Sequence, residues 1–171
     1  MTFRIAVVGP ESTGKTTLAE ALGARLGAAV VPEVARDLLP ALGRPYVEAD
    51  LADVARAQRR AEDATPAPLV ADTNLLVVRV WAEVRFGRVD PWILAHERLE
   101  TYTLHLLCAP DLPWEPDPLR EDPHRRPALF ARYEAALRAA GVPFAVVRGH
   151  GASRVEAAFA ACARAGSGGI G

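Results

Sequence analysis

The most constraining feature of the chain is a glycine-framed segment near its start, Gly9-Pro-Glu-Ser-Thr-Gly14-Lys15-Thr16. It matches the phosphate-loop pattern of Gly, any four residues, Gly, Lys and Ser/Thr. An apolar, β-branched run at residues 3–8 precedes it, and a segment with leucines at every fourth position, residues 15–26, follows it. A strand, a glycine-rich turn and a helix in this order form a phosphate-binding site. The chain is therefore expected to bind a nucleotide.

Lys15 is also the single lysine of the chain. The sequence has 20 lysine and arginine residues together, and the other 19 are arginine. A guanidinium is a broad planar fork, whereas an ammonium is a compact point charge on a thin stem. A cation that reaches a phosphate through a tight backbone loop has to be an ammonium group. Lys15 is therefore predicted to contact the β- and γ-phosphates and to act in catalysis.

The predicted nucleotide site extends over the whole loop. Its glycines let successive backbone N–H groups turn toward phosphate oxygens, and the following helix adds the partial positive charge of its N-terminus. The Thr16 hydroxyl is expected to ligate Mg²⁺, so the predicted cofactors are ATP and Mg²⁺. The nucleotide-binding residues are expected to be Gly9, Glu11, Ser12, Thr13, Gly14, Lys15, Thr16 and Thr17.

Composition argues against several other classes of protein. A chain of 171 residues suggests one domain, expected at residues 1–165, with a flexible glycine-rich tail at 166–171. A net charge of −1 gives no basic field for nucleic acid or a membrane surface, and no apolar run is as long as a membrane span. The chain start shows no signal peptide, and Cys108 and Cys162 are interpreted as buried thiols. A cytoplasmic protein is expected, and the sequence gives no indication of its oligomeric state.

Strand-like and helix-like segments alternate along the chain, which predicts an α/β fold with a parallel sheet. The strands are expected at residues 3–8, 28–31, 68–71, 101–108 and 143–147. The helices are expected at residues 15–26, 33–42, 48–64, 75–86, 91–99, 127–140 and 153–164. Right-handed crossovers place helices on both faces of such a five-stranded sheet. Together with the phosphate loop, this pattern predicts the P-loop NTPase fold.

An ATP site also needs a carboxylate on its magnesium side, and Asp72 fits this need. Asp72 ends the apolar segment Leu69-Val-Ala-Asp72, which resembles a Walker B strand. It is expected to contact the metal and to take part in catalysis and substrate binding. The alternative is that Asp72 caps the helix that begins near residue 75, although Thr73 or Asn74 could serve as that cap.

Glu33 and Arg36 follow the second predicted strand, at the edge of the sheet where ligands bind in such folds. A carboxylate there could take a proton, or accept a hydrogen bond, from an attacking hydroxyl group. Arg36 lies about one helical turn further on and could pair with Glu33 or with an anionic group. Both are candidates for substrate binding, and Glu33 also for catalysis. The alternative is an exposed ion pair within a helix, worth roughly a few tenths of a kcal/mol.

Residues 109–127 form a long proline- and arginine-rich segment after the fourth predicted strand. Such long loops are usually functional lids or disordered, and the prolines and charges favour a lid. Trp114 is expected either to stack on a flat ring or to hold the loop down. Trp81 and Trp92 are expected to serve helix packing, and His124 to lie at the surface. The lid cations expected to stabilise a transferred phosphoryl group, with Arg120 favoured as catalytic, are Arg120, Arg125 and Arg126.

Four of these segments together resemble a known family. They are Gly9-Pro-Glu-Ser-Thr-Gly-Lys-Thr-Thr17, Pro32-Glu33-Val-Ala-Arg36, Ala71-Asp72-Thr-Asn and Asp111-Leu-Pro-Trp114-Glu-Pro-Asp117-Pro-Leu-Arg120. They are similar to the kinase domain of the bacterial NadR proteins, a ribosylnicotinamide kinase of the P-loop kinase superfamily. The resemblance covers about residues 3–164. Full-length NadR proteins also carry a nucleotidyltransferase domain, which this chain lacks, so the resemblance implies a stand-alone kinase domain.

The resemblance implies an activity, the ATP-dependent phosphorylation of the 5′-hydroxyl of nicotinamide riboside in NAD biosynthesis. It further implies that Asp72 or Glu33 handles the hydroxyl or the metal, that Trp114 stacks on the nicotinamide ring, and that Arg120 stabilises the phosphoryl group. Two alternatives remain, a kinase for another nucleoside and a regulatory ATPase that reports ATP binding to a partner protein. The phosphate loop alone is compatible with all three functions.

Overall fold

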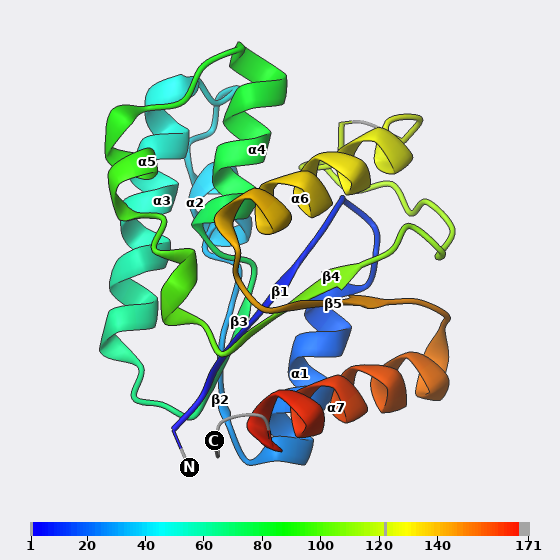
Figure 1. Cartoon of the computed structure of the whole chain (residues 1–171). Helices are drawn as coiled ribbons and strands as arrows, with labels where there is room; N and C mark the ends of the chain where they lie inside the picture. Colours follow the sequence, from blue (N-terminus) through cyan, green and yellow to red (C-terminus); the bar gives the residue numbers. More distant parts are fainter. Residues whose placement is uncertain (1, 122, 168–171) are drawn as a thin grey trace.

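Five parallel strands form one sheet in the computed structural model, which describes residues 2–121 and 123–167 (Figure 1). The strands, in the order β2-β3-β1-β4-β5, are β1 (Arg4–Val8), β2 (Ala29–Val31), β3 (Leu69–Asp72), β4 (Leu104–Cys108) and β5 (Phe144–Val147). The central strand β1 pairs with β3 on one side and with β4 on the other. The predicted parallel sheet is confirmed. The phosphate loop, which follows β1, therefore lies at the middle of the carboxyl edge of the sheet.

Helices cover both faces of the sheet and bury its strands on both sides. The helices are α1 (Lys15–Leu26), α2 (Ala35–Ala41), α3 (Glu48–Ala64), α4 (Leu75–Phe86), α5 (Pro91–His96), α6 (Arg126–Ala140) and α7 (Gly151–Ser167). Alternate residues of β1 face opposite layers. Ile5 and Val7 pack with α1 and α7, whereas Ala6 and Val8 pack with α4 and α6. Figure 1 shows α1 and α7 together on one side of the sheet and α4 and α6 on the other.

A third apolar cluster joins helices α2, α3, α4 and α5, which lie together in Figure 1. Leu51 and Val54 of α3 pack there against Leu75 and Val78 of α4. Because α4 also packs on the sheet, one of its sides faces this cluster while another faces β1 and β3. The position of α4 matters for the site, since α4 and α6 together form one wall of the space beside the phosphate loop.

The structure differs from the sequence-based expectations mainly where helices end. The helix expected at 91–99 stops at His96, because Arg98 adopts a left-handed backbone with φ of 47°. A short 3-10 helix, Leu99–Thr101, follows, and it delays the start of β4 to Leu104. Helix α6 begins one residue before its expected start, so the lid segment spans 109–125.

The last helix also reaches beyond its expected bounds. Helix α7 continues to Ser167, into the segment expected to be a flexible tail, and residues 168–171 lie outside the described part of the chain. Burial raises the pKa of the Cys108 thiol, and it raises that of Cys162 to about 11. Both cysteines are unbridged thiols; Cys108 is buried, as expected, whereas Cys162 is only partly buried. Within residues 2–121 and 123–167, none of the helices combines the length and apolarity needed to cross a bilayer.

Candidate active site

Two glycines shape the phosphate loop between β1 and α1. Gly9 has a φ of 139°, and a Cβ atom at this position would lie 2.8 Å from the carbonyl oxygen of Cys108 in β4. Gly14 has a φ of 72° and immediately precedes Lys15 at the start of α1. Only glycine adopts such positive φ values without steric strain. The two glycines therefore let the loop pass close to β4 and then turn directly into the N-terminus of α1.

Lys15 and Thr16, the first residues of α1, make the loop's main side-chain contacts. The Lys15 ammonium donates a hydrogen bond to the carbonyl oxygen of Pro10 at 2.8 Å. The Thr16 hydroxyl donates to Asp72 Oδ2 at 2.6 Å. Since β3 lies beside β1, Asp72 reaches the loop from the neighbouring strand. The structure thus brings together the two residues that the sequence predicts as metal ligands.

Asp72 is a buried carboxylate with an unused oxygen. It is 2% exposed, and its Oδ1 atom has no hydrogen-bond partner among the described residues. Burial raises the pKa of Asp72, and Glu33 adds to this effect, whereas the hydrogen bond from Thr16 opposes it. The neighbouring Asn74 caps α4 by accepting a hydrogen bond from the backbone N–H of Leu76 at 3.1 Å. Asp72 is therefore not the helix cap, and its side chain faces the loop.

Arg36 joins the start of α2 to the lid. Its Nε atom donates to Glu33 Oε2 at 2.9 Å, and its Nη1 atom donates to Asp117 Oδ2 at 2.9 Å. The Arg36 side chain is 39% exposed, while that of Glu33 is only 15% exposed. An ion pair between Glu33 and Arg36 is present, but Glu33 lies before α2 and is largely buried, so it is not the exposed pair within a helix that the alternative expected. It does not exclude a functional role, because the same arginine also holds the lid.

The lid rests on the phosphate loop through several hydrogen bonds. The Ser12 hydroxyl accepts a hydrogen bond from the backbone N–H of Glu115 at 2.9 Å. The Glu11 carboxylate accepts one from the backbone N–H of Glu121 at 2.9 Å. The Arg126 guanidinium donates to the carbonyl oxygen of Ser12 at 3.1 Å. The described residues of the segment at 109–125 thus lie against the phosphate loop.

Two adjoining pockets open beside the loop. The first, here called the phosphate pocket, is lined by Ser12, Gly14, Lys15, Thr16, Thr17, Arg36, Glu115 and Arg120. The second, here called the apolar cleft, is partly open to solvent and is lined by residues of the phosphate loop, α4 and α6. Four residues line both spaces, namely Ser12, Lys15, Arg36 and Arg120. A ligand in the phosphate pocket and a ligand in the apolar cleft would therefore meet at these four side chains.

The apolar cleft lies between α4 and α6 and has an aromatic wall. Its apolar lining includes Val77, Val80, Trp81 and Val84 from α4 and Leu129 and Tyr133 from α6. Glu33 lines the same cleft from the end of β2. Burial raises the pKa of Tyr133, and Glu33 acts in the same direction, so Tyr133 is a neutral phenol. The cleft therefore combines apolar and aromatic side chains with charged ones, among them the carboxylate of Glu33.

The tryptophan in this cleft is not the one expected from the sequence. Trp81 packs in the helical cluster, as expected, but it also lines the apolar cleft. Trp114 is not among the described residues that line either pocket. Its indole lies beside Arg126, with 5.8 Å from the guanidinium carbon to the ring centroid. This arrangement fits the alternative in which Trp114 holds the lid down.

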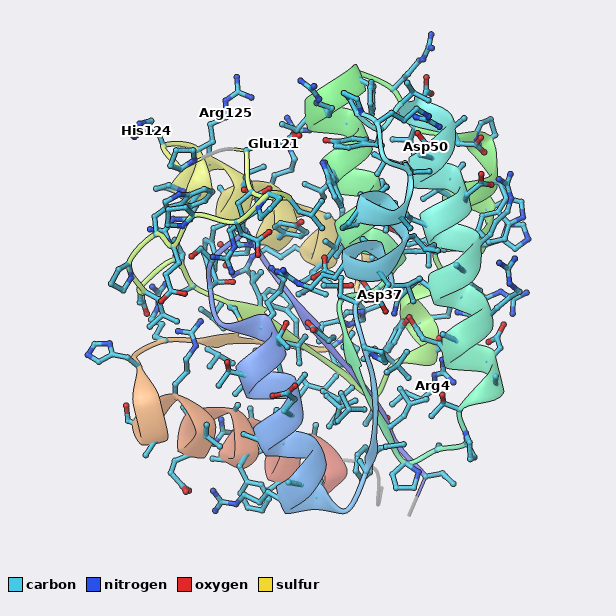
Figure 2. The ribbon with its side chains drawn as sticks, turned by 180° about the vertical axis from the view of Figure 1, so that it is seen from behind. Arg4, Asp37, Asp50, Glu121, His124 and Arg125 are labelled. Carbon is cyan, nitrogen blue, oxygen red and sulfur yellow. The ribbon has the colours of Figure 1, made fainter. Side chains whose placement is uncertain are left out.

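The three arginines that the sequence assigned to the lid have three different environments. Arg120 lines both pockets. Arg126 donates to backbone carbonyl groups of the loop and lid, including Leu112 at 2.7 Å. Arg125 and His124 point outward in Figure 2 and are exposed. Of the three predicted cations, Arg120 alone lines the phosphate pocket in the described residues.

Sequence reasoning missed Arg154, which lies under the phosphate loop. Its guanidinium donates to the carbonyl oxygens of Thr13 at 2.7 Å, Gly149 at 2.8 Å and Ala109 at 3.2 Å. These carbonyl groups belong to three separate loops at the carboxyl edge of the sheet. Arg154 is 4% exposed. A buried cation with backbone partners carries no sequence motif, so only the fold reveals that Arg154 supports the loop.

We expect Arg154→Lys to weaken binding of the ATP analogue AMP-PNP about tenfold with the fold retained. The lysine keeps the charge but cannot reach all three carbonyl groups, so the phosphate loop loses part of its support. Titration calorimetry with AMP-PNP measures the change. Arg148→Lys, at an exposed arginine in the connection between β5 and α7, is the matched control and should bind normally. Equal affinities of the two variants would show that Arg154 does not support the nucleotide site.

A family model described as an AAA domain matches residues 4–154. The chain belongs to this AAA domain family. The matched part of this AAA domain includes the phosphate loop, Asp72, the lid and Arg154. No curated protein matches the chain.

Solved structures with a similar fold include two NadR complexes and a deoxyadenosine kinase. A NadR protein in complex with NR has a TM-score of 0.77 and 23% identity, and a NadR complex with NAD and AMP-PNP has 0.74 and 22%. Each match covers 95% of this chain and 49% of the other, so the AAA domain spans about half the length of those chains. Deoxyadenosine kinase from M. mycoides has a TM-score of 0.68 and 14% identity, covering 94% of this chain and 98% of the other. These matches confirm the predicted P-loop NTPase fold.

Proposed function

We propose that the protein is an ATP-dependent kinase that phosphorylates the 5′-hydroxyl of a nucleoside, with nicotinamide riboside as the first candidate. The observation that carries this proposal is the junction of the two pockets at Ser12, Lys15, Arg36 and Arg120. A kinase needs a donor phosphate and an acceptor molecule in adjoining sites. A regulatory ATPase has no need for a cleft with apolar side chains that opens onto the phosphate pocket. The cleft therefore favours the kinase over the regulatory ATPase.

ATP is the donor that fits the phosphate pocket. The loop glycines, Lys15 and the N-terminus of α1 supply backbone N–H groups and positive charge for a triphosphate. The NadR structure in complex with AMP-PNP supports this choice, because its fold matches over 95% of this chain. Lys15 is proposed to contact the β- and γ-phosphates.

Mg²⁺ fits the pair formed by Thr16 and Asp72. The buried Asp72 Oδ1 atom, which lacks a partner in the described residues, is the kind of hard oxygen ligand that Mg²⁺ prefers. Residues 2–121 and 123–167 contain no cluster of three or more acidic, histidine or cysteine side chains that could hold a metal. A site with two protein oxygens fits Mg²⁺, which keeps water and phosphate ligands. A bound Mg²⁺ would neutralise charge on the phosphate oxygens.

The acceptor is proposed to lie in the apolar cleft with its ring against Trp81. Valine side chains of α4 and Leu129 of α6 surround that position, which suits a flat heterocycle. Nicotinamide riboside carries a cationic ring, and an indole face attracts such a ring. Glu33 and Glu11 add negative charge to the same cleft. The NadR structure in complex with NR supports this candidate.

Glu33 is proposed as the base and Asp72 as the metal ligand. Glu33 lines the apolar cleft, whereas Asp72 bonds to Thr16. In the reaction the acceptor 5′-oxygen forms a bond to the γ-phosphorus and the bond to the ADP oxygen breaks. The 5′-hydroxyl proton passes to the Glu33 carboxylate, because the 5′-oxygen becomes more acidic as it shares its electrons with phosphorus. Arg36 and Arg120 stabilise the charge that spreads over the transferred group.

Incubation with ATP, Mg²⁺ and a panel of nucleosides tests the proposal. We expect a 5′-monophosphate from nicotinamide riboside, or from another nucleoside of the panel, detected by mass spectrometry. ADP should appear in equal amount. If AMP-PNP binds but no nucleoside is phosphorylated, the kinase proposal is wrong and the regulatory ATPase becomes the better interpretation.

In NAD biosynthesis such a kinase would work in the cytoplasm, which also suits the two unbridged thiols.

We expect Trp81→Ala to raise the KM for the acceptor at least about tenfold while the KM for ATP changes little. The variant removes the aromatic wall of the apolar cleft but leaves the phosphate pocket intact. Steady-state kinetics with each substrate varied in turn measures both constants. Trp114→Ala is the matched control, because Trp114 lies on the lid beside Arg126. A larger acceptor effect for Trp114→Ala would restore Trp114 as the stacking residue.

A further inference from the structure

Tyr46 lies behind the wall of the apolar cleft and fixes its tryptophan. The indole N–H of Trp81 donates a hydrogen bond to the Tyr46 hydroxyl oxygen at 2.9 Å. The two rings also meet edge to face, with centroids 5.4 Å apart and an interplanar angle of 71°. Phe86 supports Tyr46 on another side in the same way. The orientation of the Trp81 ring in the cleft therefore depends on Tyr46.

The Tyr46 hydroxyl also reaches the lid. It donates a hydrogen bond to Glu121 Oε1 at 2.8 Å. Burial raises the pKa of Tyr46 to about 12, and Glu121 adds to the shift, so the phenol keeps its proton at neutral pH. Arg85 lies 3.9 Å from the second carboxylate oxygen of Glu121. Figure 2 places Glu121 on the lid, at the opposite end of the molecule from Arg4.

Glu121 in turn binds the phosphate loop. Its backbone N–H donates to the Glu11 carboxylate at 2.9 Å. A continuous set of hydrogen bonds thus runs from Trp81 through Tyr46 and Glu121 to Glu11. Both ends of this set line the apolar cleft, and its middle belongs to the lid. Tyr46 itself is not among the described residues that line the cleft.

We propose that Tyr46 is a positioning residue that couples the acceptor wall to the closed lid. The inference rests on the proposed kinase function. When ATP holds the phosphate loop and the closed lid together, Glu121 fixes Tyr46, and Tyr46 fixes the Trp81 ring for the acceptor. The acceptor therefore binds more tightly in the presence of ATP, and by thermodynamic reciprocity ATP binds more tightly in the presence of the acceptor.

The test measures this coupling in Tyr46→Phe. The variant keeps the ring that packs on Trp81 and Phe86 and removes only the hydroxyl. Nicotinamide riboside is titrated by calorimetry with and without AMP-PNP and Mg²⁺. We expect AMP-PNP to tighten nicotinamide riboside binding about tenfold in the unmodified protein and to have almost no effect in Tyr46→Phe. In steady-state kinetics the KM for nicotinamide riboside should rise about tenfold with little change in kcat.

A conservative pair of variants at Glu121 separates coupling from folding. Glu121→Gln keeps an oxygen that accepts the Tyr46 hydrogen bond and should retain most of the coupling. Glu121→Ala removes it and should behave like Tyr46→Phe. Tyr102→Phe is the matched control, since Tyr102 donates a similar hydrogen bond to the buried Glu62. It should lower the unfolding temperature without changing the coupling.

The outcomes separate this inference from the function it rests on. If the unmodified protein phosphorylates a nucleoside but Tyr46→Phe keeps normal coupling and normal acceptor KM, Tyr46 is not a positioning residue. If Tyr102→Phe loses coupling as strongly as Tyr46→Phe, the effect is a general loss of stability and the inference is wrong. If no nucleoside is phosphorylated by the unmodified protein, the proposed function fails, and the coupling role fails with it.

Discussion

Replacing Lys15 by arginine should reduce phosphoryl transfer by about 10²–10³-fold while the protein remains folded, because the charge is kept and the shape is not. The Lys15 ammonium lies 2.8 Å from the Pro10 carbonyl, inside a loop that needs glycine at both ends. A planar guanidinium is too broad for the same position. The rate of ADP and 5′-monophosphate formation, with the thermal unfolding temperature beside it, measures the effect.

Lys15→Met is the companion variant. Methionine keeps a slim, unbranched side chain and removes the charge, so it should lose transfer to a similar extent. If Lys15→Arg works nearly as well as the unmodified protein while Lys15→Met does not, charge alone is required at this position. The absence of a second lysine from the sequence would then be a matter of composition and not of function.

Replacing Asp72 by asparagine should also cost about 10²–10³-fold in transfer, yet it should not destabilise the protein at neutral pH. Asparagine keeps the shape and can still accept the hydrogen bond from Thr16. It removes the buried charge that the proposed Mg²⁺ site requires. Transfer rates at increasing Mg²⁺ concentration, together with denaturant unfolding, test both parts of the prediction.

The pH dependence of stability gives an independent test of Asp72. Burial raises the pKa of this carboxyl in the folded protein above the value of about 4 expected in the unfolded chain. As the pH rises from the pKa of the unfolded chain to the raised pKa of the folded protein, the unfolded chain releases its proton first. The contribution of Asp72 to the free energy of unfolding therefore falls as the pH rises, and Asp72→Asn removes this loss. If the variant instead loses stability relative to the unmodified protein as the pH rises, a neighbouring cation stabilises the ionised carboxylate.

The sequence predicted those parts of the fold and site that depend on local signals. The phosphate loop, the alternation of strands and helices, and the carboxylate at the end of β3 all follow from short patterns. Asp72 could be assigned to the loop because parallel neighbouring strands end at the same edge of a sheet. The helix cap was left open at this point, and the structure gives that role to Asn74.

Residues whose roles depend on three-dimensional neighbours could not be predicted. Helix α4 carries apolar side chains around most of its surface. Its sequence pattern therefore does not show that Trp81 lines the cleft as well as packing in the helical cluster. Arg154 donates hydrogen bonds to backbone carbonyl groups. Every residue has such a group, so these partners leave no motif in the sequence. Tyr46 lies in a short connection between α2 and α3, and its partners come from α4 and the lid.

The contact between Lys15 and the Pro10 carbonyl has a consequence for turnover. One of the three N–H groups of the ammonium is already bonded to the loop's own backbone, so in the proposed kinase a triphosphate would compete with this carbonyl group. After transfer the same carbonyl group could accept the ammonium again as ADP leaves. In the proposed kinase the loop would thus moderate its own affinity for nucleotide, and a bond that re-forms within the protein would help product release.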